Sequence, residues 1–212
     1  IDVELAPTER SAIFRIHFPR VEKANIVIEA SRNPHYSGYV RVDSAKNEIT
    51  GYNTDLDDEN ISPPLANFRG YFVIEFDRPI AHYGAWQKDS IHDGAAEISG
   101  DRIGAYVVFD ARENQTLHAR IGTSFISIEQ ARENLRKEIP AWNFDETAMN
   151  GKKIWSDRLS SIGIEGANEE QKEVFYTALY RTLLFPRIFS EYGRYYSAFD
   201  DRVHNGESYN DY

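Results

Sequence analysis

The sequence contains no cysteine, no long apolar run and comparatively little positive charge. Without cysteine, disulfide bonds and thiolate metal sites are impossible. No apolar stretch approaches the roughly 20 residues that span a bilayer. The chain has 24 Lys and Arg against 34 Asp and Glu, which gives a formal net charge of -10. This acidic balance disfavours nucleic acid and anionic membranes as partners, whereas a neutral substrate is compatible with it.

Several common catalytic and metal-binding patterns are also missing. None of the 6 histidines pairs with another at the i, i+4 spacing of a helical zinc site, and there is neither a G-x-S-x-G elbow nor a glycine-rich phosphate loop. The loop at 53–64 is acidic but lacks the central glycine of an EF-hand, so a solvated loop is favoured over a calcium site. Its acidic residues are Asp55, Asp57, Asp58 and Glu59.

What is present first is a series of short strand patterns. In "AIFRIHF", Ile13 and Arg15 share one face and Phe14 and Ile16 share the other, which is the period of two of a half-buried strand. The close spacing leaves little room for crossover helices, so the fold class is predicted to be mainly β, an antiparallel β-sandwich. Similar runs lie at 24–30, 38–43, 48–53, 70–77, 103–110 and 116–127.

The pattern then becomes helical. Ser127 and Gln130 form a capping box that opens a helix ending at Pro140, a weaker helix follows at 144–162, and a short strand is expected at 162–166. Asn168 caps a third helix, whose broad apolar face is suited to packing against other helices. A hairpin turning at Tyr192-Gly193 is expected next. We therefore predict a sandwich domain at 1–126, a helical linker at 127–166, and the start of a helical domain at 167–212.

Three places carry candidate chemistry. Asp145 and Glu146 could be paired catalytic carboxylates, but at a helix N-terminus capping is favoured. Trp86 and Trp142 could stack on sugars, although packing is the usual role of tryptophan. The stretch 199–212 interleaves rings with carboxylates and amides, as a saccharide pocket does; a polar surface loop is the alternative. Its members are Phe199, Asp200, Asp201, His204, Asn205, Glu207, Tyr209, Asn210, Asp211 and Tyr212.

Five stretches together resemble glycoside hydrolase family 92, the bacterial exo-acting α-mannosidases. They are "ITGYN" at 49–53, "YFVIEFDRPI" at 71–80, and those at 122–140, 169–187 and 193–199. The resemblance covers most of the chain. It implies a β-sandwich joined by linker helices to an (α/α)6 barrel, of which this chain holds the first helix.

The resemblance also implies an activity, which is calcium-dependent hydrolysis of terminal α-mannosides, for example α-1,2, with inversion. The family's acid, base and most Ca2+ ligands lie downstream, so no catalytic or metal residue is assigned, and the fragment alone is expected to be inactive. Tyr209 and Asp211 are expected to lie near the substrate pocket. The resemblance implies that the protein's partners are mannose-containing glycans and its own missing catalytic barrel. The protein would be periplasmic or extracellular after export.

Two other functions remain open. One is a self-sufficient, non-catalytic carbohydrate-binding sandwich module, which the unburied apolar helix at 169–186 argues against. The other is part of another sandwich-plus-barrel glycosidase or phosphorylase. The abrupt last stretch, "FDDRVHNGESYNDY", leads us to expect a truncated chain.

Overall fold

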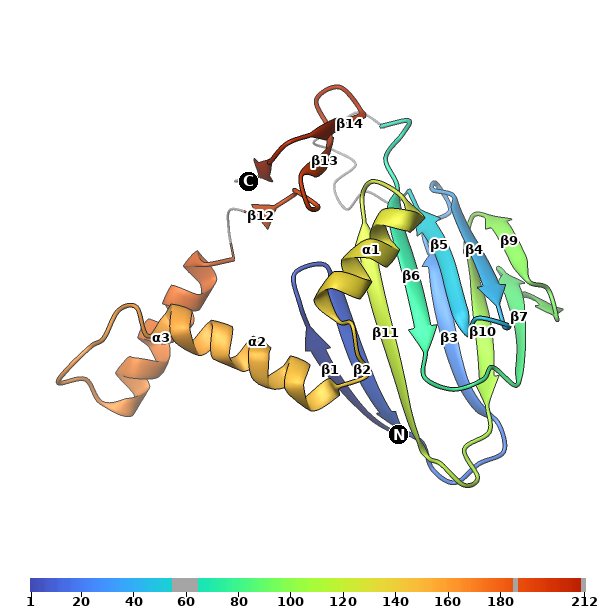
Figure 1. The fold of residues 1–212 in the computed structure, drawn as a ribbon, viewed down its shortest axis with the longest axis horizontal. Coiled ribbons are helices and arrows are strands. Elements are labelled where there is room, and N and C mark those ends of the chain that lie inside the picture. The colour runs from blue at the N-terminus through green and yellow to red at the C-terminus, as the bar shows by residue number, and fades with distance from the viewer. Residues whose placement is uncertain (55–64, 185–186, 211–212) are drawn as a thin grey trace.

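The predicted β-sandwich is confirmed. The computed structural model describes residues 1–54, 65–184 and 187–210. Of residues 209 and 210 it describes the backbone alone. Within these ranges, two antiparallel sheets stack face to face, as Figure 1 shows. The larger sheet has the order β1 (Asp2–Pro7), β2 (Ser11–His17), β11 (Thr116–Ser124), β6 (Gly70–Phe76), β5 (Glu48–Asn53), β4 (Gly38–Asp43) and β9 (Glu97–Gly100). The smaller has β3 (Ala24–Ser31), β10 (Ile103–Phe109), β7 (His82–Gln87) and β8 (Ser90–Asp93).

Alternation along the strands fills the space between the two sheets. Val107 and Phe109 on β10 point inward and meet Phe76 of the larger sheet, whose ring centroid lies 5.0 Å from that of Phe109. Leu117 of β11 and Ile49 of β5 are buried in the same core. The central strands of both sheets therefore give a face to the core, as the period of two predicts, whereas β8 at the edge of the smaller sheet buries none of its residues.

Helix α1 (Ile128–Glu138) covers the outer face of the larger sheet. Ser127 caps it by accepting a hydrogen bond from the Gln130 backbone, as predicted. Ala131 and Leu135 are fully buried against Ile13 and Val73 of the sheet and form a second apolar core. Helix α1 therefore packs as a third layer on the sandwich.

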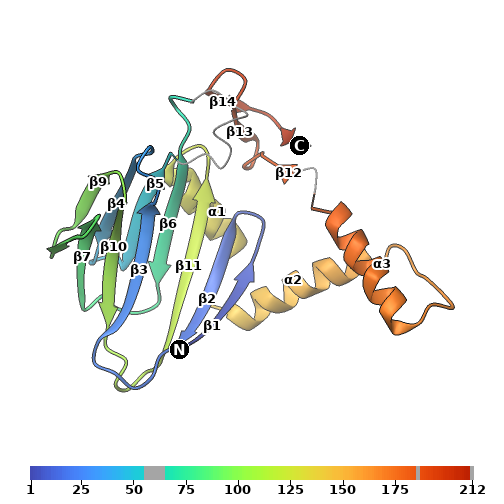
Figure 2. The same cartoon turned by 180° about the vertical axis from the view of Figure 1, so that it is seen from behind.

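The next two helices leave the sandwich, as Figures 1 and 2 show. Helix α2 (Phe144–Leu159) is anchored at its first residue, Phe144, which is its one buried residue. Helix α3 (Glu169–Thr182) buries none of its residues, although Asn168 and Gln171 form a complete capping box at its start. No described helix is long and apolar enough to cross a membrane. The strand expected at 162–166 is not formed, since those residues are irregular.

The C-terminal strands pair differently from the prediction. Tyr192 and Gly193 do adopt turn conformations, with φ of 55° and 84°. The strands beside them do not pair with each other: β12 (Arg187–Ile188) pairs with β15 (Tyr209–Asn210), and β13 (Arg194–Ser197) pairs with β14 (Arg202–Asn205). The predicted hairpin is therefore wrong, because β12 finds its partner about twenty positions further along the chain.

Candidate functional site

The candidate site lies where the C-terminal strands rest on one end of the sandwich. Figure 1 shows β12 to β14 above the ends of β6, β11 and α1. Two adjoining hollows open there, of about 620 Å³ and 500 Å³, volumes in the range of small-molecule sites. Both are lined by Tyr71 at the start of β6 and by Phe125 just after β11.

A buried carboxylate joins the C-terminal strands to the sandwich. Glu191 is only 2% exposed. Its Oε1 accepts a hydrogen bond from the Phe125 backbone N–H at 2.8 Å, and its Oε2 accepts one from Asn134 Nδ2 at 2.8 Å. Asn134, fully buried on α1, also donates to the Thr123 carbonyl at 2.8 Å. Because both carboxylate oxygens are occupied by donors of the sandwich, Glu191 acts as a structural link between the two parts.

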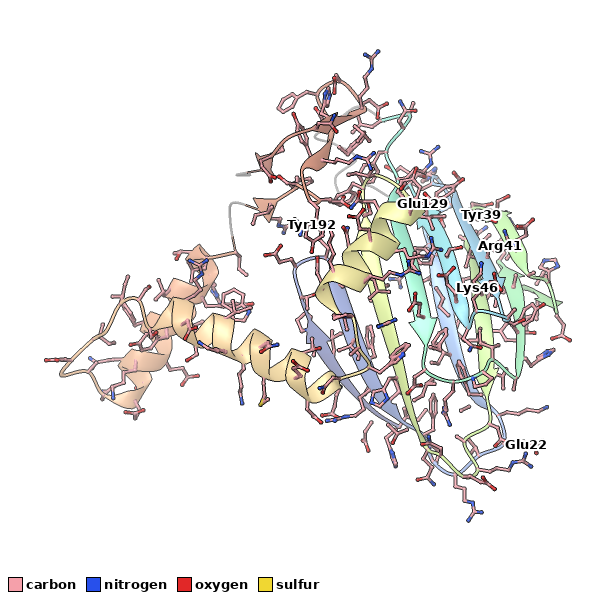
Figure 3. All side chains as sticks on the ribbon, viewed as in Figure 1. Glu22, Tyr39, Arg41, Lys46, Glu129 and Tyr192 are labelled. Carbon is pink, nitrogen blue, oxygen red and sulfur yellow. The ribbon has the colours of Figure 1, made fainter. Side chains whose placement is uncertain are left out.

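A second carboxylate, Glu138 at the end of α1, ties together the turn after β1 and the C-terminal segment. Its Oε2 accepts from Thr8 Oγ1 at 2.6 Å and from the Arg10 backbone N–H at 2.9 Å. Tyr192 packs beside it, with Lys137 Nζ 3.9 Å and Arg10 Cζ 5.6 Å from its ring centroid. Figure 3 shows Tyr192 in this position between the C-terminal strands and the sandwich.

The third link is Asp201, in the turn of the β13–β14 hairpin. It accepts a hydrogen bond from the Asn67 backbone N–H at 3.0 Å and one from the Tyr196 hydroxyl at 2.5 Å. Burial, followed by this bond to Asp201, raises the pKa of Tyr196 well above its ordinary value. Tyr196 is therefore a neutral hydrogen-bond donor at physiological pH, and the hairpin is fixed beside Asn67.

The smaller hollow has the more polar wall. Arg69, Asp201 and Arg202 line it beside the rings of Tyr71 and Phe125. Charged groups and rings converging on one hollow can bind a polyhydroxylated ligand, because rings cover its C–H faces and charged groups take its hydroxyls.

The structure places part of the predicted stretch 199–212 at this junction. Asp201 lines the smaller hollow, whereas Phe199 is 96% exposed at the hairpin turn. His204 Nε2 lies 2.8 Å from Asp200 Oδ2, and this contact lowers the pKa of Asp200. The ring of His204 also stacks on Tyr195, with centroids 5.5 Å apart.

The two predicted pocket residues cannot be compared in the same way. Tyr209 lies on β15 with its backbone opposite Ile188, and its side chain is not described. Asp211 lies outside the described residues. Both stay predictions. The acidic loop residues Asp55, Asp57, Asp58 and Glu59 also lie outside the described residues.

The other candidates are accounted for by packing and capping. Asp145 bonds to Arg15 at 2.9 Å, and Glu146 accepts from the side chain of Asn143, which caps α2. The guanidinium of Arg120 lies over the ring of Trp142, and the distance from Arg120 Cζ to the ring centroid is 4.4 Å. Glu146 thus takes part in the cap of α2, whereas Asp145 forms an ion pair with β2 instead of capping the helix.

No metal centre is evident in the part of the chain that the structure describes. Its residues bring together no group of three or more His, Asp or Glu side chains that could hold an ion. The Ca2+ implied by the family resemblance is therefore given no ligand here, and no chemistry is routed through it.

Sequence reasoning missed the residues that build the junction. Asn134 could have been noticed, because it follows Gln130 by four positions and so extends a polar row beside the apolar row of α1. Gln130 Nε2 does donate to Asn134 Oδ1 at 3.1 Å. Glu191 and Phe125 carried no comparable signal, since they meet across 66 positions of the sequence.

Comparison with known proteins matches both parts of the chain. The family model of the Glycosyl hydrolase family 92 N-terminal domain matches residues 1–124, and that of the family 92 catalytic domain matches residues 130–212. A solved family 92 inverting mannosidase from Bacteroides thetaiotaomicron is 31% identical, with a TM-score of 0.87 over 97% of this chain.

Two further relatives agree with this match. A family 92 α-mannosidase from the same organism, at 23% identity and a TM-score of 0.84 over 98% of this chain, supports the fold. A secreted glycosidase of Arthroderma benhamiae is 30% identical over a 95-residue alignment that covers 42% of this chain. This chain spans 28% and 29% of the two solved chains and 12% of the glycosidase.

Proposed function

Since the chain belongs to glycosyl hydrolase family 92, we propose that it is part of a glycoside hydrolase that removes terminal α-mannosyl residues from glycans with inversion. The observation that carries this proposal is the 31% identity and TM-score of 0.87 to an inverting mannosidase over 97% of this chain. The α-1,2 linkage is one candidate specificity. Mannose-containing glycans are then its ligands.

Within such an enzyme, this chain supplies the sandwich (1–126), the linker (127–166) and the first elements of an (α/α)6 catalytic domain (167–212). The apolar side chains of α2 and α3 support this division, because they are exposed here and would be buried by further barrel helices. They are Met149, Ile154, Trp155, Val174 and Tyr180, and Leu183 and Leu184 directly after α3 are exposed as well.

The catalytic acid and base are proposed to lie outside this chain. An inverting enzyme needs a carboxylic acid with a raised pKa facing a carboxylate base across a gap that admits water. At the junction, Glu191 is already saturated by two donors, and Asp201 accepts from Asn67 and Tyr196. The pKa of Asp200 is lowered rather than raised. These three carboxylates are therefore suited to holding the C-terminal strands in position. A bound Ca2+ would be held by other groups.

Tyr209 and Asp211 are proposed to approach the mannose pocket. The support is their position directly after the junction: the backbone of β15 is held against β12, and Ser208 N–H donates to Ser190 Oγ at 2.6 Å. This bond fixes the direction in which the chain leaves the hollows. Export from the cytoplasm is proposed as well, on the strength of the secreted relative.

The test is an assay of the protein as expressed from its gene, after its intact mass has been compared with that of this chain. We expect turnover of an aryl α-mannoside, β-mannose as the first product in the proton NMR spectrum, and loss of activity with EDTA that calcium restores. α-Mannose as the first product, or turnover of other glycosides alone, would overturn the proposed reaction.

Two further measurements locate the chemistry. The 212-residue chain alone should show no turnover; clear turnover would place the acid and base within it. In the expressed protein, Asp211→Asn should raise KM more than about tenfold, whereas the control Asp2→Asn, at an exposed position of β1, should not. Equal KM values for the two variants would remove Asp211 from the pocket.

A further inference from the structure

The outer face of the smaller sheet, on the side away from the helices, carries a flat aromatic surface. Helices α1 and α2 contact strands of the larger sheet, and Figure 2 shows β3, β10 and β7 with no helix over them. On this face, Trp86 of β7 and Tyr106 of β10 are each half-buried. Neither ring lines a junction hollow; of the residues in the surface's two rows, Glu29 at one end also lines the larger hollow.

Two glycines make the surface flat. Gly104 lies beside Trp86 on the neighbouring strand, and a Cβ at Gly104 would lie 2.5 Å from the Nε1 and Cε2 atoms of Trp86. Gly84 lies beside Tyr106 in the same way, and a Cβ there would lie 2.5 Å from the Tyr106 hydroxyl oxygen. Each ring therefore covers a glycine where any side chain would clash with it, and each ring stays partly exposed to solvent.

The register places the two rings in adjacent rows. One row runs Ile91, Trp86, Gly104, Glu29 across four strands, and the next runs Asp93, Gly84, Tyr106, Val27. Ile91 and Val27 are exposed at the edges. The rows thus form an apolar floor about two rings wide, with one carboxylate at each end.

The polar edge of this floor is already oriented. Asp93 Oδ1 accepts hydrogen bonds from the Tyr106 hydroxyl and from His82, whose Nε2 lies 2.6 Å away. These two bonds, the one from Tyr106 first, lower the pKa of Asp93, so it is ionised at neutral pH. Among the described residues, none donates to Asp93 Oδ2, and the Asp93 side chain is 70% exposed. A charged acceptor therefore stands fixed beside the ring of Tyr106.

We propose that this surface, made of Trp86, Tyr106 and Asp93, binds a hexopyranose ring of a glycan at a second place on the protein. The sugar's C–H face lies on the two rings, and its hydroxyls donate to Asp93 Oδ2. The carboxylates at both ends and the net charge of -10 disfavour an anionic ligand, and an uncharged polyol matches both the flat floor and the acceptor. The indole N–H of Trp86 is buried without a hydrogen-bond partner, so stacking uses the ring face.

The test follows the indole N–H signals of the three tryptophans in proton–nitrogen NMR spectra of this chain. Phe substitutions assign Trp86, Trp142 and Trp155, and the chain is titrated with α-1,2-mannobiose, cellobiose and lactose. We expect the Trp86 signal alone to shift, with roughly millimolar affinity, since one sugar ring supplies few contacts. Asp93→Asn should weaken binding about tenfold or more.

A matched control separates binding from sheet stability, because rings over glycines also stabilise sheets. Asp77→Asn alters another aspartate–histidine pair, in which Asp77 Oδ2 lies 2.8 Å from His118 Nδ1, and it should leave sugar binding unchanged. Thermal unfolding confirms that both variants are folded. An unmoved Trp86 signal with all three sugars, or equal affinity for the wild type and Asp93→Asn, would overturn the proposal.

The choice of sugars also separates this inference from the proposed function, which supplies mannose as the first probe. Shifts with cellobiose or lactose but not with mannobiose would uphold the surface as a saccharide site and count against the mannoside preference. Shifts of Trp142 or Trp155 of the same size as that of Trp86 would count against a site at this surface.

Discussion

The β-sandwich and the helix pair α2–α3 both carry abundant apolar side chains, yet they bury them very differently. In the sandwich, Phe109 and Leu117 are almost completely inaccessible to solvent. In the helix pair, Phe144 is the one buried residue of α2, and α3 has none. Val174 on α3 is 66% exposed. The first region completes its own core, whereas the second presents a surface that needs another layer.

The difference shows that good local signals do not make a stable element. Helix α3 has a full capping box and acidic residues in its first turn. A helix of 14 residues is nevertheless marginal in water, because most helix stability in proteins comes from packing an apolar face. The sandwich should therefore determine the free energy of unfolding of this chain. Helix α3 should unfold separately from the sandwich and with a smaller free energy.

The largest test of this contrast is a pair of truncations. Phe109→Ala removes a ring from the core and should lower the free energy of unfolding by about 3–5 kcal/mol, through lost burial and the cavity left behind. Val174→Ala should change it by less than about 0.5 kcal/mol. Urea unfolding followed by tryptophan fluorescence gives both values. A loss above about 1 kcal/mol in Val174→Ala would show that α3 is packed in solution and would break the comparison.

The next effect concerns the link between the sandwich and the C-terminal strands. Glu191→Ala leaves the Phe125 N–H and Asn134 Nδ2 without their buried acceptor, which should cost about 3 kcal/mol. Hydrogen exchange at the Phe125 amide should become faster, by the factor that corresponds to this loss of free energy. Glu207→Ala, at an exposed position of the same segment, is the control and should leave that exchange rate unchanged. Similar rates in the two variants would mean that Glu191 does not hold the junction.

A smaller and sharper comparison removes the same kind of cap from two helices. Ser127→Ala at α1 and Asn168→Ala at α3 should each cost their helix about 1 kcal/mol. Because α1 is packed on the larger sheet, its loss should lower the urea midpoint of the whole sandwich. The loss at α3 should appear only as reduced helical circular dichroism. A sandwich midpoint that falls equally in both variants would contradict the separation.

The sandwich was predictable from sequence where both faces of a strand are strongly marked. The bounds 38–43 and 48–53 agree residue for residue with β4 and β5, because apolar and polar residues alternate there between clear turns. Strand β7 was missed because "HYGAWQ" has Gly84 and Ala85 at its centre. Strand β8 was missed because all four of its residues are exposed and show no apolar alternation. β1, which exposes nearly all its residues, and β9 escaped for similar reasons.

The junction was less predictable for a different reason. A turn is encoded locally, so Tyr192-Gly193 was recognised, but pairing depends on residues distant in the chain. Glu191 and Phe125 meet across 66 positions, and Asn67 meets Asp201 across 134. Neither contact leaves a mark in a short window of sequence. Family resemblance supplied the proposed function, and the tertiary contacts supplied the residues that hold the candidate site together.

The smallest expected effects are those of exposed ion pairs, which should be alike in the two regions. In the sandwich, Arg112 donates to Asp110 at 2.5 Å and lowers the pKa of Asp110 to about 2. A folded-state pKa below the ordinary value of 3.8 contributes stability above that value, and this contribution is lost as pH falls toward about 2. Arg112→Gln should therefore move the titration of the Asp110 carboxyl carbon upward, toward its ordinary midpoint.

At pH 7 the same substitution should lower the urea midpoint only slightly, because the Asp110 carboxylate is exposed to solvent and its interaction with Arg112 is screened. Lys172→Gln is its counterpart on α3, where Lys172 Nζ lies 2.8 Å from Glu169, and it should have an equally small effect. If Arg112→Gln lowered the midpoint as much as Ser127→Ala, surface charge would contribute to the sandwich's advantage over α3. Two equally small effects would instead leave buried apolar surface as the difference between the regions, since their exposed ion pairs would then be equivalent.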